Sequence, residues 1–205
     1  MSGQLYVISG PSGVGKSTIV QQLRNSVKDL AYSISYTSRN PREKEVDGVN
    51  YHFVDRETFE KMIQEKAFVE WAEVYDALYG TSLDILQKQR SQGLDVVLDM
   101  DSQGAINIRK HYEESTLIYI LPPSLEILDE RLRGRGTDAE EVIQSRFEKA
   151  IREIEQCVDY DYIVFNEEID RAVEELTCII LSHRARKSRR LPTVEKIFDM
   201  PLSHK

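Results

Sequence analysis

A glycine-rich segment that follows a short apolar run constrains this chain more than any other feature. Residues 5–9 are mostly apolar, and residues 10–17 satisfy the pattern G-x-x-x-x-G-K-[ST] at every fixed position. Between residues 18 and 30, apolar side chains recur at the spacing of an α-helix. A strand, a glycine loop and a helix in this order predict a loop that wraps around phosphate groups.

The residue types of this loop suit a nucleoside triphosphate. Glycines at positions 10, 13 and 15 let the backbone turn successive N–H groups toward phosphate oxygens at a helix N-terminus. Lys16 is expected to reach the β- and γ-phosphates, and the Ser17 hydroxyl is the expected protein ligand of Mg²⁺. The loop alone does not identify the group that accepts a phosphate.

Length and composition favour one compact enzyme with insertions, because the chain has 205 residues, of which 40% are hydrophobic and 30% charged. No run approaches the roughly 18 apolar residues of a membrane helix, and residues 1–4 resemble no signal segment, so we expect a cytoplasmic protein without a membrane partner. The net charge of −8 argues against a general nucleic-acid binder. Cys157 and Cys178 are expected to be buried, reduced thiols rather than a redox pair or a zinc site.

Further strands are predicted at residues 32–38, 95–101, 116–121 and 162–165, with helical patterns between the later ones. The near-continuous apolar run of residues 95–101 is typical of a strand that is covered on both faces. The repeated β-α rhythm therefore predicts an α/β fold with a mostly parallel sheet of about five core strands.

Charged residues follow two of these strands. Arg39 and Arg42 flank a proline, which suits either a rigid turn that aims two guanidinium groups at an anion or a solvated charged turn. Asp99 and Asp101 end a core strand, where open α/β sheets bind ligands, and Asp99 is a candidate for the magnesium shell. Residues 101–104 also fit the D-x-x-G pattern of GTP-hydrolysing switches, but no Asn-Lys-x-Asp follows, which argues against a GTPase.

Glu70 lies inside an apolar run, and its spacing fits either the exposed face of a strand or a buried acceptor for a specific pair of donors. Residues 131–136 carry three arginines and two glycines, and Thr137 with Glu140 forms a capping box, so we expect a hinged lid. The following helix is predicted to place Arg146 off its apolar stripe, which comprises Ile143, Phe147, Ile151, Ile154 and Val158.

A C-terminal helix is predicted from about residue 170 to 187, with Val173, Leu176 and Ile180 buried. The basic run of residues 184–190 is most simply a solvated helix end. The tail beyond residue 192 has no clear class, and packing on the core, association and mobility all stay open.

Taken together, these motifs resemble those of the guanylate kinase family, in the family's order and at matching separations, over roughly residues 5–181. The motifs that carry the resemblance are residues 10–17, Ser35 with residues 37–42, Asp47 and Gly48 followed by Tyr51, residues 68–71, 78–81, 99–104 and 122–124, and residues 131–136 with Arg146.

The resemblance implies roles for individual residues. The implied GMP-binding residues are Arg39, Arg42, Tyr51 and Tyr79 on the phosphate, and Ser35, Glu70, Thr81 and Asp101 on guanine. The implied catalytic residues are Lys16, Arg42, Arg135 and Arg146. The implied ATP-binding residues are Gly10, Pro11, Ser12, Gly13, Val14, Gly15, Lys16, Ser17, Thr18, Arg131, Arg135 and Asn166. Mg²⁺ would be bound by Ser17, with Asp99 acting through water.

The implied architecture is a P-loop NTPase-type α/β protein with an inserted GMP-binding module and a lid. The core would comprise residues 1–32, 88–127 and 155–205, the module residues 33–87 and the lid residues 128–154.

The implied reaction is ATP + GMP ⇌ ADP + GDP, with dGMP as a second acceptor. Two alternatives compete with it. One is a guanylate-kinase-like domain that binds a protein partner, but such domains typically have an eroded phosphate loop and this one is intact. The other is a kinase for another small acceptor, against which Glu70, Ser35 and Asp101 argue. The sequence leaves the oligomeric state open.

Overall fold

A five-stranded parallel sheet forms the core of the protein. The structure, a computed structural model, describes residues 2–43, 45–74, 76–134 and 140–202. The strands lie in the order β2-β7-β1-β8-β9, and every pairing is parallel, as predicted. They are β1 (Leu5–Ser9), β2 (Leu30–Tyr32), β7 (Asp95–Asp99), β8 (Thr116–Leu121) and β9 (Tyr162–Phe165).

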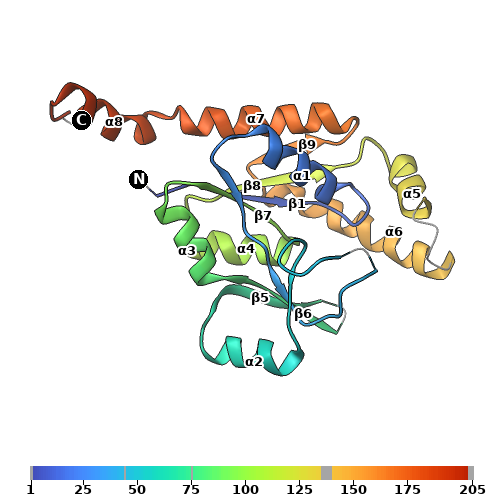
Figure 1. Ribbon diagram of the computed structural model, residues 1–205. Helices are drawn as coiled ribbons and strands as arrows, with labels where there is room; N and C mark the ends of the chain where they lie inside the picture. Colours follow the sequence, from blue (N-terminus) through green and yellow to red (C-terminus); the bar gives the residue numbers. More distant parts are fainter. Residues whose placement is uncertain (1, 44, 75, 135–139, 203–205) are drawn as a thin grey trace.

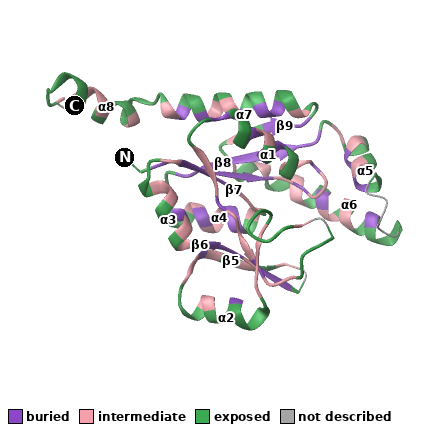
Figure 2. Cartoon of the chain, in the orientation of Figure 1, coloured by how far each residue is buried: buried purple, intermediate pink, exposed green. Residues whose placement is uncertain are grey.

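Helices cover both faces of this sheet (Figure 1). Tyr6 and Ile8 of β1 pack with α1 (Lys16–Ser26) and α7 (Ile169–Arg184) on one face. Leu5 and Val7 pack with α3 (Leu83–Ser91) and α4 (Ser102–His111) on the other face. β1 is therefore buried on both sides, which explains its apolar sequence (Figure 2).

A second, four-stranded sheet lies beside the core and carries α2 (Arg56–Gln64) on its outer side (Figure 1). Its strands lie in the order β4-β3-β6-β5, and they are β4 (His52–Phe53), β3 (Tyr36–Thr37), β6 (Ala77–Ser82) and β5 (Phe68–Val74). The prediction of one strand over residues 32–38 was wrong. The chain leaves the core sheet after Tyr32 and enters the second sheet at Tyr36, so the alternating pattern spans two short strands.

Helices α5 (Leu125–Arg133) and α6 (Glu140–Ile154) pack against each other through Leu128, Leu132, Ile143 and Ala150. The predicted apolar stripe of α6 needs a correction, because Ile151 and Val158 are exposed. The α-helical periodicity stops at Ile154, where a 3₁₀ helix (Glu155–Asp159) begins and turns Val158 toward solvent. Thr137 of the predicted capping box lies outside the described residues.

The C-terminal part continues from α7 into α8 (Lys187–Phe198), which extends away from the body of the molecule (Figure 1). The prediction of a solvated basic run was wrong for Arg184 and Arg189. Their side chains bind the carboxylate of Asp95 at 2.8 Å and 3.1 Å, and that carboxylate is only 3% exposed. The backbone N–H of Gln4 also donates to Asp95, so this residue joins the start of the chain to its end.

The cysteines also differ from the prediction, because Cys178 is exposed on α7 and Cys157 is only half-buried. Their surroundings in the sequence are helical, but which face of the helix is covered depends on packing that the sequence does not show. Across the described ranges, none of the helices combines the length and apolarity needed to cross a membrane.

Replacing Asp95 with asparagine is expected to lower the free energy of unfolding by about 2–4 kcal/mol, because two arginines lose the charge of a buried partner. Urea denaturation of the variant and the wild type measures this change. Glu167→Gln serves as the control, since it removes a 3.6 Å contact to Arg171 between exposed side chains, worth no more than about 0.5 kcal/mol. Equal losses in the two variants would show that Asp95 does not fasten the C-terminal helices.

Candidate active site

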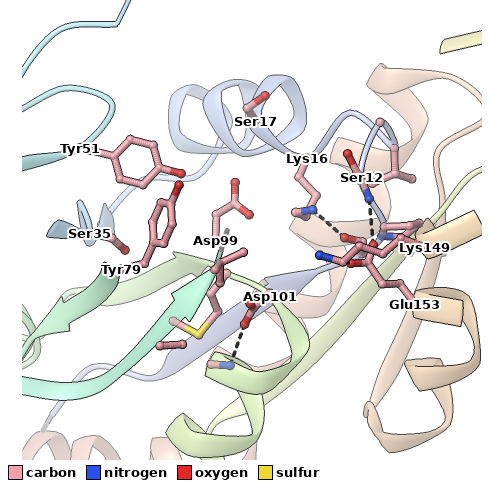
Figure 3. A pocket seen from close by; sticks show the side chains of 18 of the residues that line it. Ser12, Lys16, Ser17, Ser35, Tyr51, Tyr79, Asp99, Asp101, Lys149 and Glu153 are labelled. Atoms are coloured by element: carbon pink, nitrogen blue, oxygen red, sulfur yellow. Dashed lines mark hydrogen bonds and ion pairs between the residues drawn. The ribbon is translucent and has the colours of Figure 1, made fainter. Parts of the chain in front are cut away.

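A cavity of about 400 Å³ lies where the carboxyl ends of β1 and β7 face the second sheet. Figure 3 shows Ser35, Tyr51 and Tyr79 at one end of it, Ser12, Lys149 and Glu153 at the other, and Asp99 between them. The predicted residues that line the cavity are Gly10, Pro11, Ser12, Gly13, Val14, Gly15, Lys16, Ser17, Ser35, Arg42, Tyr51, Glu70, Tyr79, Asp99 and Asp101. Residues without a predicted role also line it, namely Ala72, Val74, Gly80, Met100, Gly104, Lys149 and Glu153.

The phosphate loop allows no side chain at two of its glycines. A Cβ on Gly10 would lie 2.3 Å from the carbonyl oxygen of Ile120, and one on Gly15 would lie 2.7 Å from Nδ2 of Asn166. Gly15 also has a φ of 96°, which favours glycine, and it immediately precedes α1. The Lys16 ammonium donates to the carbonyl of Gly10 at 2.6 Å, so the lysine side chain lies across the loop.

Two carboxylates that line the cavity are each held through one oxygen. The Thr81 hydroxyl donates to Oε1 of Glu70 at 2.6 Å, and the backbone N–H of Gly104 donates to Oδ1 of Asp101 at 2.9 Å. Glu70 thus lines the cavity and does not lie on the exposed face of the strand, which was one of the two alternatives that its spacing left open. Burial raises the pKa of Glu70, and the neighbouring charge of Asp101 adds to this shift.

The prediction of a solvated turn fails for Arg39, whose side chain is only 17% exposed, whereas Arg42 is exposed. Its guanidinium binds both carboxylate oxygens of Glu45, at 2.6 Å and 2.7 Å, donates to the Tyr79 hydroxyl at 3.2 Å and lies 5.0 Å from the centre of the Tyr51 ring. These bonds hold the pKa of Glu45 below its ordinary value. Glu45 was not predicted from the sequence, although its position three residues after Arg42 in the same turn was a usable signal.

Several predicted residues lie next to the cavity without lining it. Arg131 donates to the backbone carbonyls of Val14, at 3.4 Å, and Asn166, at 2.9 Å, so it braces the loop. Asn166 itself donates from Nδ2 to Val14 at 2.6 Å. Arg146 donates to the Ser12 hydroxyl at 3.2 Å. Arg39, Thr81 and Thr18 are also absent from the lining, and Arg135 lies outside the described residues.

Lys149 and Glu153 reach the cavity from α6, and neither was predicted from the sequence. Arg146, Lys149 and Glu153 are spaced i, i+3 and i+7, which places them on one face of a helix. Since Arg146 was predicted to point toward a ligand, this spacing could have identified the other two.

The residues near Lys16 fit a magnesium ion. The Ser17 hydroxyl and the Asp99 carboxylate both line the cavity. Burial raises the pKa of Asp99 while the charge of Lys16 opposes this shift, so a cation would suit that carboxylate. The described residues contain no cluster of three or more His, Cys, Asp or Glu side chains that could hold a metal. Mg²⁺ bound to nucleotides needs no such cluster, because phosphates and water supply most of its ligands.

A phosphate loop at the carboxyl edge of a parallel sheet, with arginines and carboxylates across one cavity, defines a P-loop NTPase-type protein with two polar subsites. Comparison with known proteins gives the family. The family model described as guanylate kinase matches residues 2–183. The chain therefore belongs to the guanylate kinase family, as its motifs indicated.

Individual relatives are similar over nearly the whole chain. A guanylate kinase of Syntrophotalea carbinolica is 47% identical over 201 residues, which are 98% of this chain and 96% of that protein. One of Caldanaerobacter subterraneus subsp. tengcongensis is 48% identical over 91% of each chain. The crystal structure of guanylate kinase from Anaplasma phagocytophilum superposes with a TM-score of 0.80 at 29% identity, covering 98% of both chains.

Proposed function

We propose that this protein transfers the γ-phosphoryl group of ATP to the phosphate of GMP, giving ADP and GDP, with dGMP as a second acceptor. One observation carries the proposal: a complete phosphate loop and a carboxylate pair line the same cavity, so a donor and an acceptor can meet inside it. The division into a core, a GMP-binding module of residues 33–87 and a lid of residues 128–154 is part of this proposal.

Glu70 and Asp101 suit guanine in particular. Guanine presents its N1–H and its exocyclic amino group side by side, and a carboxylate accepts from both, whereas adenine offers no such pair. Each carboxylate is fixed through one oxygen by a protein donor, which orients the other toward a ligand. Thr81 would then act through Glu70, and Ser35 would add a hydroxyl at the same end of the cavity. A buried polar site rejects bases that leave its groups unpaired.

The acceptor phosphate would be bound by Arg39, Arg42, Tyr51 and Tyr79. Arg42, Tyr51 and Tyr79 line the cavity, and Arg39 is held behind them by Glu45 and the Tyr79 hydroxyl. Burial and the neighbouring Asp99 raise the pKa of Tyr51 to about 12, so its phenol keeps its proton at neutral pH and can donate to a phosphate oxygen.

Phosphoryl transfer needs alignment and charge neutralisation rather than a general base. Lys16, Arg42, Arg135 and Arg146 would neutralise the phosphates, while Arg131 and Asn166 brace the loop that positions them. Ser17 and Asp99 would hold Mg²⁺, which supplies further neutralisation of phosphate charge. Closure of the module and lid would exclude water from the cavity.

The direct test mixes the protein with ATP, GMP and Mg²⁺ and measures ADP and GDP by chromatography. Equal amounts of the two products, and their loss when EDTA removes Mg²⁺, are the expected results. ATP binding without GMP-dependent turnover would instead favour the protein-binding module. A cytoplasmic location stays a prediction from the sequence.

The KM for GMP is expected to rise as the pH falls from neutral toward the ordinary pKa of a glutamate, because burial raises the pKa of Glu70 above that ordinary value. A protonated carboxyl group accepts the paired guanine donors less well than a carboxylate. Steady-state kinetics across this range measure the change. The GMP phosphate also titrates in this range, so Glu70→Gln serves as the reference. Parallel pH profiles in the two proteins would contradict the assigned role of Glu70.

A further inference from the structure

Glu153 of α6 contacts the phosphate loop directly. Its Oε2 accepts the backbone N–H of Ser12 at 3.2 Å, and the residue lines the donor end of the cavity (Figure 3). Backbone N–H groups of this loop bind phosphate oxygens in proteins of this class. A carboxylate at such an N–H therefore stands where a phosphate oxygen of ATP is expected.

A carboxylate and a phosphate exclude each other at this position. One N–H cannot make a full hydrogen bond to both, and two anions in a partly buried site repel each other. The Glu153 side chain is only 23% exposed, so water screens this repulsion poorly. Glu153 must leave Ser12 before the nucleotide's phosphate takes its place.

Lys149 offers the displaced carboxylate a partner on the same helix. Its Nζ lies 3.6 Å from Oε1 of Glu153, one helical turn away, and Lys149 also lines the cavity. The backbone of Glu153 is held in place, because the Tyr119 hydroxyl of β8 donates to its carbonyl. A side-chain rotation can therefore move the carboxylate from Ser12 toward Lys149 while this end of α6 stays on the sheet.

Ser12 is the loop residue that contacts α6 through both its backbone and its side chain. Arg146, which is proposed to bind the transferred phosphate, contacts the Ser12 hydroxyl from the same face of α6. Because Arg146 contacts Ser12, the terminal phosphate of ATP is the phosphate expected at the Ser12 N–H. Next to the acceptor end, Glu45 binds the Arg39 guanidinium through both carboxylate oxygens, so a carboxylate also contacts a proposed phosphate-binding group there.

We propose that Glu153 is an internal substitute for the terminal phosphate of ATP, and that ATP displaces it onto Lys149. This inference rests on the proposed placement of the ATP phosphates at the loop. Glu153 then acts as a positioning residue that keeps the loop and α6 together in the absence of nucleotide, and it lowers the affinity for ATP more than the affinity for ADP.

The test is calorimetric titration of ATP and of ADP, with Mg²⁺ and without GMP, into the wild type and Glu153→Gln. The variant is expected to bind ATP about five- to tenfold more tightly, because the competing charge is gone. Its affinity for ADP is expected to change by less than about twofold. Unchanged or weaker ATP binding by a folded Glu153→Gln protein overturns the proposal, as does an equal gain for both nucleotides.

Glu148→Gln is the matched control, because Glu148 is exposed on the same helix and contacts Gln144 instead of the loop. Lys149→Gln supplies a second test. It is expected to weaken ATP binding in the wild type but not in the Glu153→Gln background, since its effect passes through Glu153. Equal weakening in both backgrounds would show that Lys149 acts on the nucleotide directly.

Lys16→Met separates this inference from the proposed function. If that variant keeps both the ATP affinity and the GMP-dependent turnover of the wild type, the phosphates do not lie at the loop, whatever the Glu153 variants do. Thermal melting of each variant, compared with the wild type, shows that binding is measured on folded protein.

Discussion

Replacing Lys16 with methionine is expected to lower kcat by roughly 10²- to 10³-fold or more, the loss typical of removing one preorganised charge from a transition state. The ammonium lies across the phosphate loop, 2.6 Å from the Gly10 carbonyl, and lines the cavity. Methionine keeps much of the length of the side chain but cannot neutralise phosphate charge. Steady-state kinetics with ATP and GMP measure the loss, and thermal melting checks that the fold is retained.

Lys28→Met is the matched control for this prediction, because Lys28 is exposed beyond the end of α1 and far from the loop in the sequence. It removes the same charge from the protein and is expected to keep wild-type kinetics. A Lys16→Met enzyme with near-normal kcat would show that the loop lysine does not act on the transferred phosphate.

Glu70→Gln is expected to lower kcat/KM for GMP by roughly 10³-fold while leaving the KM for ATP almost unchanged. The glutamine amide replaces one acceptor oxygen with a donor, which then faces the donors of guanine. The loss should be large because the site is buried and the unpaired groups find no water. The kinetic constants for GMP are measured by varying GMP at saturating ATP. Those for ATP are measured by varying ATP at saturating GMP, so the effects on the two substrates are distinguished.

Glu73→Gln provides the control for the Glu70 variant. Glu73 lies on the same strand but on its exposed face, where it binds Arg56 at 3.0 Å, so its loss should change neither substrate's kinetics. The opposite orientation of the two residues follows from the alternation of side chains along a strand. A Glu70→Gln enzyme that retains the GMP kinetics of the wild type would show that the Glu70 carboxylate does not recognise the base.

The parts of the fold that depend on residues close together in the sequence could be predicted. The phosphate loop, the strand that begins at Asp95 and the strand over residues 116–121 all follow from short-range patterns. Side chains within a few positions of each other settle these features.

Features that depend on distant contacts could not be predicted. The partner of Arg184 is Asp95, 89 residues earlier in the chain, and nothing in the basic run indicates a buried carboxylate. The break between Tyr32 and Tyr36 was missed for a similar reason, because residues on both sides of the break alternate as strands do while pairing in different sheets. The exposure of Cys178 likewise depends on which face of α7 meets the core.

The candidate site lies between these two cases. Its motifs identified fifteen of the residues that line the cavity, because each motif carries its chemistry in a few adjacent positions. Glu45 and Glu153 were missed because a carboxylate among phosphate-binding groups contradicts simple charge matching. Their positions in the sequence could have pointed to them, but the N–H and guanidinium groups that they contact are visible only in the structure.

The most direct test of the central claim is ADP production from ATP and Mg²⁺ with GMP, AMP, CMP and UMP offered separately. The assigned roles of Glu70 and Asp101 predict strong turnover with GMP and little with the other three nucleotides. Comparable turnover with AMP, CMP or UMP would leave the fold and the phosphate loop in place but contradict the guanine site.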